Sequence, residues 1–331
     1  MKKRIIVCLF MCILLLTGCG KMGEDGIVKK MSETLDKAKA YHLTGNLEII
    51  SNEEKYQYDV DVSYEKEDKF RVSLKNKTNN HEQIILKNTD GVYVLTPSLN
   101  KSFKFQSEWP YNNSQTYLLQ NLVDDIKEDK NRTFKKEKDG YIFTVKANYS
   151  NNKDLTKQNI YVDSKMNITK VEVLSKEGQV KMTMNVKKID LKANYKKNYF
   201  TLKDNMEVSA SASVKETTKI EDIVYPMYLP ENTKLTSQDR LKKDKGERVI
   251  LNFTGENPFT LVEETASIEK GDTIIPVSGE PKMIADVVGN VSDGSISWIS
   301  NNVEYYITSS KLSETELLDI ANSISVLPVS K

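Results

Sequence analysis

Apolar and polar residues alternate along much of the first 200 residues, and this pattern constrains the fold more than any other feature. Between Tyr56 and Tyr64, even positions are apolar or aromatic and odd positions are polar. The segments 69–75 and 180–186 alternate in the same way. Successive side chains of a strand point to opposite faces, so a period of two indicates strands with one buried and one solvated face. Such strands are typical of antiparallel sheets.

The pattern predicts a long meandering sheet with two helices. Asp90-Gly91 and Asp139-Gly140 are typical hairpin turns, because such pairs tolerate positive φ. Apolar residues at helical spacing predict helices near 24–40 and 114–130. The expected strands cover residues 41–49, 56–64, 69–75, 92–96, 101–106, 132–136, 140–148, 158–163, 168–175 and 179–190. A sheet this long tends to curl, and the two helices can cover its apolar face.

The composition changes after residue 205. Residues 206–222 are mainly small, polar or charged and lack a core pattern, which indicates a linker. Ser313 and Glu316 have capping-box spacing, so a helix is expected at about 314–325. Short strands are expected at 247–254, 259–264, 273–277, 282–288, 294–300 and 303–309. Residues 223–331 are therefore predicted to form a small α+β domain.

The first 19 residues have the pattern of a secretory signal. Basic residues at positions 2–4 precede an apolar stretch from Ile5 to Leu16. A bilayer-spanning helix needs about 20 apolar residues, so this stretch is too short for a transmembrane anchor. Leu16-Thr17-Gly18-Cys19 resembles the bacterial lipobox. That resemblance implies removal of residues 1–18 by cleavage between Gly18 and Cys19. It also implies a diacylglycerol on Cys19, with residues 19–26 as a short tether on the outer face of the cell membrane.

The net charge and the cysteine content limit the classes of partner and of metal site that the mature chain can have. The signal carries three basic residues, so its removal changes the net charge from +1 to −2. A chain this close to neutral has no general basic field, and we expect no nucleic-acid partner. Cys8 and Cys12 lie in the signal, which leaves Cys19 as the only cysteine of the mature chain. We therefore expect no disulfide and no cysteine-based metal site.

The order of motifs in the first half resembles the LolA-like lipoprotein-carrier superfamily. The matching segments are a leading helix, the meander, and the blocks Asn159–Asp163, Val171–Val173 and Asn198–Leu202. The resemblance covers about residues 24–204. It implies an incomplete antiparallel β-barrel over residues 27–205, with helices in its concave face and an apolar cavity that accepts acyl chains. The expected fold is thus mainly β with some α, a half-barrel followed by the small α+β domain.

The second half resembles a domain of unknown function found in spore-forming bacteria. Tyr228–Glu231, Trp298, Tyr305 and Leu312–Ile324 carry this likeness. Together, the two halves resemble sporulation and germination lipoproteins of Firmicutes, and the first half is similar to the germination lipoprotein GerS. This chain is expected to differ from the carriers in one respect: the carriers are soluble shuttles, whereas this chain is expected to be anchored to the membrane.

Residues that could support catalysis are few. His42 and His81 are the only histidines, and neither belongs to a paired-histidine motif. Asp124-Asp125 and Glu263-Glu264 are adjacent carboxylates, whose side chains diverge on a helix or a strand. The sequence contains no phosphate-binding glycine loop and no serine-nucleophile motif. We therefore expect no enzyme, no catalytic or metal-ligating residue and no cofactor.

Aromatic residues on the predicted strand faces are candidates for the lining of a lipid cavity. These candidates are Tyr58, Phe70, Phe103, Phe105, Trp109, Tyr141 and Phe143. The alternative, which the pattern favours, is that they form the core between sheet and helices. Trp109-Pro110-Tyr111 is a candidate lid edge.

Two functions are consistent with these observations. The first is a non-catalytic, membrane-anchored docking module with an envelope protein partner, acting in sporulation, germination or cortex processing. The second is a lipid-binding or lipid-transfer protein that holds an acyl chain in the half-barrel.

Overall fold

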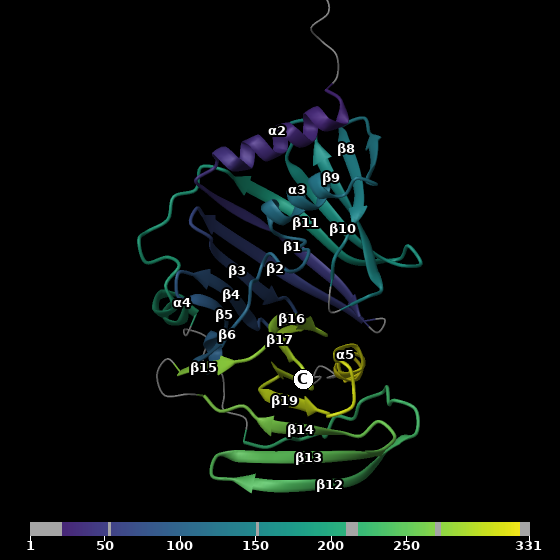
Figure 1. Cartoon of the computed structure of the whole chain (residues 1–331). Coiled ribbons are helices and arrows are strands. Elements are labelled where there is room, and N and C mark those ends of the chain that lie inside the picture. The colour runs from purple at the N-terminus through teal and green to yellow at the C-terminus, as the bar shows by residue number, and fades with distance from the viewer. Residues whose placement is uncertain (1–21, 52–53, 150–151, 210–217, 269–272, 325–331) are drawn as a thin grey trace, which may run out of the picture.

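A computed structural model describes residues 22–51, 54–149, 152–209, 218–268 and 273–324. The signal, Gly18, Cys19 and the first tether residues lie outside these ranges. Two sheets dominate the described chain, one of twelve strands and one of seven (Figure 1). In the described residues, no helix combines the length and the apolar character needed to cross a bilayer.

The large sheet has the strand order β15-β6-β5-β4-β3-β2-β1-β11-β10-β9-β8-β7. Its strands are β1 (Ala40–Ser51), β2 (Glu54–Glu65), β3 (Lys69–Asn76), β4 (Glu82–Asn88), β5 (Gly91–Thr96), β6 (Lys101–Phe105), β7 (Thr133–Lys136), β8 (Gly140–Lys146), β9 (Leu155–Asp163), β10 (Ile168–Ser175), β11 (Val180–Asp190) and β15 (Thr273–Val277). All pairings are antiparallel except that of β15 with β6. β15 and β7 form the two edges, so the sheet does not close, and the expected incomplete antiparallel barrel is confirmed.

Helices α2 (Glu24–Lys37) and α3 (Leu119–Glu128) cover the concave face of this sheet (Figure 1). α2 buries Ile27, Val28 and Met31, and α3 buries Leu119, Leu122, Val123 and Ile126. α3 is shorter than the predicted 114–130 segment, because residues 114–118 are irregular, with a turn at 116–117, and the helix begins only at Leu119. A single core joins the two helices to the inner side chains of the strands.

A second layer, absent from the sequence-based prediction, lies on the convex face. Ile84, Leu86, Tyr93 and Leu95 point outward from β4 and β5, and Phe200 and Met206 cover them. Met206 belongs to α4 (Leu202–Ser209), so residues 206–209 of the predicted linker are helical. The alternation pattern did not predict strand β4 either. Its Ile84-Ile85-Leu86 run does not alternate because both faces of the strand are buried.

The small sheet has the order β12-β13-β14-β19-β18-β17-β16. Its strands are β12 (Thr233–Lys243), β13 (Gly246–Gly255), β14 (Phe259–Thr265), β16 (Glu280–Ile284), β17 (Val287–Ser292), β18 (Ser295–Ser300) and β19 (Val303–Thr308). Helix α5 (Glu314–Asn322) packs on one face, and the predicted capping box of Ser313 and Glu316 is present. β12 was not predicted, since it is exposed on both faces and has no apolar pattern.

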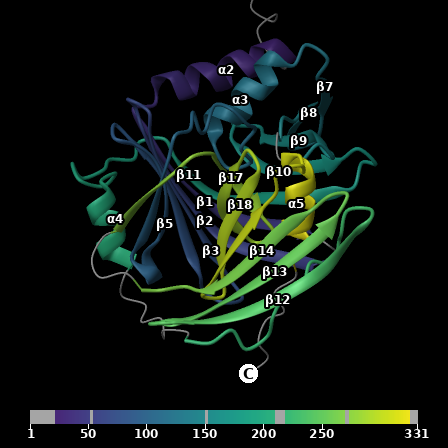
Figure 2. The same cartoon turned by 60° about the horizontal axis from the view of Figure 1, so that its bottom comes forward.

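The two sheets join where the small sheet meets β4–β6. We refer to this junction as the seam. Strand β15, expected in the small domain, instead extends the large sheet beside β6. The buried amide of Gln83 pairs with Val288 twice: its Nε2 donates to the Val288 carbonyl at 2.9 Å, and its Oε1 accepts from the Val288 N–H at 2.7 Å. Val288 packs into the core of the large sheet, and Figure 2 shows β17 and β18 in front of β1–β3.

We expect Gln83→Ala to destabilise the chain by roughly 2–4 kcal/mol, because it leaves a buried N–H and a buried C=O of Val288 without partners. Urea unfolding followed by tryptophan fluorescence would measure this loss. Gln57→Ala is the matched control, since the Gln57 side chain is exposed and, among the described residues, bonds only to Glu48. Equal midpoints for the two variants would show that the Gln83 pairing does not stabilise the seam.

Candidate functional site

Protein side chains fill most of the concave face of the large sheet. Phe70 and Phe143 are completely buried, and Trp109 packs edge-on against Phe70 with ring centroids 5.9 Å apart. Tyr58 is buried and donates to the Asp286 carbonyl at 2.6 Å, while Tyr141 stacks on Phe134. Tyr58, Phe70, Trp109 and Phe143 therefore sit in the core, and Tyr141, which is partly buried, packs against it. Trp109 also borders a cavity of about 60 Å³, too small for an acyl chain.

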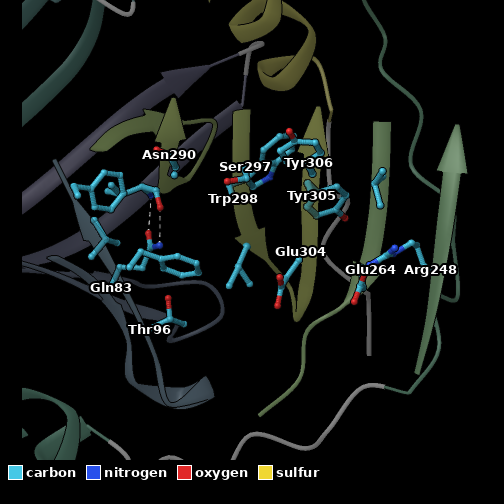
Figure 3. Close-up of a pocket in the computed structure, with 17 residues that line it drawn as sticks. Gln83, Thr96, Arg248, Glu264, Asn290, Ser297, Trp298, Glu304, Tyr305 and Tyr306 are labelled. Carbon is cyan, nitrogen blue, oxygen red and sulfur yellow. Dashed lines mark hydrogen bonds and ion pairs between the residues drawn. The ribbon is translucent and has the colours of Figure 1, made fainter. Parts of the chain in front are cut away.

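A larger cavity lies at the seam, between β4–β6 of the large sheet and the strands of the small sheet (Figure 3). Its volume is about 300 Å³, at the lower end of the range of small-molecule sites. Phe103 and Phe105, the other two candidates, form one wall together with Val94 on the neighbouring strand. Val262 and Ile299 of the small sheet contribute to the facing wall. We call this space the seam cavity.

Charged residues on the rim of the seam cavity are already paired. Arg248 and Lys243 both form ion pairs with Glu264, and Lys101 pairs with Glu304. Figure 3 shows Arg248 and Glu264 side by side at one side of the cavity, with Glu304 beside them. The buried Oδ1 of Asn290 has no hydrogen-bond partner among the described residues. The seam cavity is thus an apolar chamber with a polar rim, suited to an apolar chain that ends in a polar group.

Sequence reasoning found only one wall of this cavity. Phe103 and Phe105 are recognisable as aromatic residues of an alternating strand. Val262 and Val288 lie in short apolar strands that look like ordinary core, and nothing in the sequence shows that they face β6. The missing information is the contact between segments that are about 200 residues apart.

The adjacent carboxylates do not form acid–base pairs. Asp124 is exposed and pairs with Lys127, whereas Asp125 accepts a hydrogen bond from Gln158, and burial raises its pKa to about 6. Glu263 and Glu264 point to opposite faces of β14. In the described part of the chain, no cluster of three His, Cys, Asp or Glu residues could hold a metal ion.

The histidines have ordinary roles. His42 lies 2.8 Å from Asp61 on the convex face. His81 follows the turn between β3 and β4, and burial lowers its pKa. Neither histidine lines the seam cavity.

Glu263 is the most strongly perturbed carboxyl of the small sheet. It is fully buried, its Oε1 accepts from the Val224 N–H at 2.9 Å, and its Oε2 has no partner among the described residues. Desolvation raises its pKa from 4.5 to about 7, although the hydrogen bond from Val224 and, to a lesser extent, the charge of Arg240 oppose the shift. The unfolded chain therefore releases this proton at a lower pH than the folded chain, and stability decreases as the pH rises from about 4.5 through 7.

We expect Glu263→Gln to remove this decrease and to raise stability at pH 8 by about 2 kcal/mol relative to the parent chain. The Gln side chain still accepts from Val224 but carries no charge. Urea unfolding between pH 5 and 8 would measure the effect. Glu264→Gln, on the opposite face, should keep the pH slope of the parent, and a parent-like slope in Glu263→Gln would contradict the assignment.

Comparison with known proteins places the chain in a family. No family model matches it. It is 33% identical over 318 residues to the sporulation protein YdcC of Bacillus subtilis (strain 168), covering 94% of this chain and 93% of the relative.

Solved structures with partial similarity include the GerS lipoprotein in complex with the CwlD amidase from Clostridioides difficile. That match has a TM-score of 0.31 and 18% identity, and it covers 53% of this chain and 96% of the other. Another is the LolA superfamily protein NE2245 from Nitrosomonas europaea, with a TM-score of 0.31, 10% identity, and coverage of 54% and 98%. The identity to YdcC extends over nearly the whole of both chains and confirms the expected relation to sporulation proteins: the chain belongs to the family of the sporulation protein YdcC.

Proposed function

We propose that this protein is a non-catalytic lipoprotein of sporulation or germination that docks an envelope protein. In this proposal, diacylglycerol on Cys19 anchors it to the outer face of the cell membrane. The relationship to YdcC supports the cellular process. The filled concave face is evidence against a carrier that needs an open half-barrel.

The observation that carries the docking role is an exposed apolar strip at the start of the small domain. The strip consists of Tyr225, Met227, Tyr228 and Leu229, whose exposed fractions are 46%, 83%, 42% and 39%. The Tyr225 hydroxyl bonds to Gln238 on β12, and the Met227 N–H donates to the Ser323 carbonyl at 3.3 Å. Contiguous exposed apolar residues on a soluble domain are typical of an interaction site.

The position of the strip fits an anchored protein. α2 follows the proposed tether and lies at one end of the molecule, while β12 lies at the opposite end (Figure 1). The expected tether, residues 19–26, is shorter than predicted because α2 begins at Glu24. The five residues 19–23 reach at most about 18 Å, so the α2 end would stay near the membrane. The strip, beside β12, would then face away from it. Of the four basic residues of β12, Arg240 and Lys243 pair with Glu247 and Glu264, whereas Lys234 and Lys242 are exposed. These two lysines favour a partner with acidic residues around an apolar segment.

A photo-crosslinking residue at position 227 tests this proposal in sporulating cells. We expect it to capture one envelope protein, identified by mass spectrometry and competed by excess unlabelled chain. The same residue at position 180 is the control, because Val180 is an exposed apolar residue of β11 in the large sheet. Cys19→Ser should release the protein from the membrane fraction and lower the yield of the cross-link. Equal labelling from positions 180 and 227 would overturn the docking role of the strip.

The seam cavity supports a second candidate function, the binding of an acyl chain or a similar apolar ligand. It uses only Phe103 and Phe105 of the predicted lining, together with residues of the small sheet. A lipid-binding role would therefore need both halves of the chain.

Native mass spectrometry of residues 24–331, with oleate as the probe, tests this candidate. We expect one bound oleate per chain and about tenfold weaker binding for Val262→Trp, which fills the cavity. Ile250→Trp is the matched control, because Ile250 is the cross-strand partner of Val262 and does not line the cavity. Failure of the parent chain to bind, or equal binding by both variants, would exclude the seam cavity as a lipid site.

A further inference from the structure

A polar cleft of about 700 Å³ lies on the convex face of the large sheet, on the opposite side from the seam cavity. Its floor is formed by Asp61 on β2, Arg71 and Ser73 on β3, and Glu82 on β4. The segment 194–205, which crosses the convex face before and within α4, forms the wall. We call it the convex cleft. Its volume is within the ~300–1,000 Å³ range of small-molecule sites.

Arg71 on the floor has unused hydrogen-bonding capacity. Its side chain is only 13% exposed, and Nε donates to Asn205 Oδ1 at 2.6 Å. Nη1 lies 3.6 Å from Asp61 Oδ1, and Nη2 lies 3.8 Å from Glu82 Oε1. Both distances allow ion pairing but exceed a good hydrogen bond. Within the described chain, the terminal nitrogens of Arg71 therefore make no hydrogen bond, although the group is largely removed from solvent.

Arg132, an arginine with the same exposed fraction, differs from Arg71 in its hydrogen bonds. Arg132 is also 13% exposed, but its Nε donates to Glu24 at 2.6 Å and its Nη2 donates to Asp25 at 2.9 Å. Its Nη1 donates to the Asp129 carbonyl. Arg132 is a structural arginine that ties α2 to the end of α3, whereas Arg71 keeps N–H groups available beside a cleft.

The charge around Arg71 argues against a strongly charged ligand. Asp61, Glu82 and Asp204 line the cleft and would repel phosphate, while Arg71 and Lys196 would repel a cation. A neutral ligand with many hydroxyls avoids both penalties, because a hydroxyl donates to a carboxylate and accepts from a guanidinium. The carboxylates on either side of the guanidinium thus match a molecule whose donors and acceptors alternate.

The wall of the cleft offers an apolar surface beside these polar groups. Tyr195 and Tyr199 stack with ring centroids 4.5 Å apart, and the guanidinium carbon of Arg71 lies 6.0 Å from the Tyr199 centroid. A sugar ring presents hydroxyls at its edge and C–H groups on its faces, so it can use both kinds of surface. We infer that the convex cleft binds an uncharged segment of a carbohydrate chain, such as a glycan of the cell envelope. This inference is independent of the docking strip and of the seam cavity.

Isothermal titration calorimetry with chitotetraose and maltotetraose tests the inference. The full chain is purified from membranes in a detergent without a sugar headgroup, so that the detergent cannot occupy the site. We expect saturable binding of at least one oligosaccharide and none of inorganic phosphate. Arg71→Gln should weaken binding at least about tenfold, because it removes charge-assisted hydrogen bonds. Arg132→Gln, the matched control, should bind like the parent.

Arg71→Gln also loses the bond to Asn205, so a second variant separates binding from folding. Asn194→Trp places a large side chain in the cleft from an exposed position of the wall. We expect this variant to unfold at the same denaturant concentration as the parent chain and to bind no oligosaccharide. Absence of binding by the folded parent to either oligosaccharide would overturn the inference. So would unchanged affinity in both cleft variants, or phosphate binding that depends on Arg71.

Discussion

The packing of β17 against the end of the large sheet is the contact on which the rest of the structure depends. Gln83 satisfies both backbone groups of Val288 in a place that water does not reach, and Val288 completes the core that begins at α2. β15 holds the same junction by extending the large sheet beside β6. Two kinds of contact therefore hold the small sheet over the end of the concave face: the Gln83 side-chain amide bonded to Val288, and the backbone hydrogen bonds between β15 and β6. The position of the seam cavity follows from this arrangement.

The same contact affects what the concave face of the half-barrel can hold. A carrier of acyl chains needs an open concave face, but here Trp109, α3 and Val288 occupy that face. What remains open lies between the sheets and cannot be formed by either sheet alone. The available surfaces are therefore separated along the molecule: the apolar strip at the end opposite α2, the seam cavity in the middle and the convex cleft on the outer face. In the function that we propose, this separation favours a protein that holds partners in place over one that moves them.

Residue patterns predicted the parts of this structure in which each strand has one wet face. The alternation from Tyr56 to Tyr64 and the capping box at Ser313 both correspond to the observed elements. The pattern did not reveal β4, which is apolar on both faces, or β12, which is polar on both. It also could not reveal the seam, because Gln83 and Val288 are 205 positions apart and each looks ordinary in its own strand. The role of Arg71 could not be predicted either, because in the sequence it is one polar residue of an alternating strand. Only the folded chain places it beside Asp61 and Glu82.

The buried carboxyls bear on whether such a chain could also be an enzyme. Active sites are often marked by titratable groups with shifted pKa values that act together. Here burial raises the pKa of Asp125 and Asp286 to about 6 and that of Glu263 to about 7. These groups lie on α3, in the turn between β16 and β17, and on β14, and none of them is among the charges that shift another. Asp125 accepts hydrogen bonds from Ser114 and Gln158, and Glu263 accepts one from the Val224 N–H. Asp286 takes part in the seam, where its carbonyl accepts from Tyr58. Burial at structural contacts explains their raised pKa values, and none of the three carboxyls shifts the pKa of another.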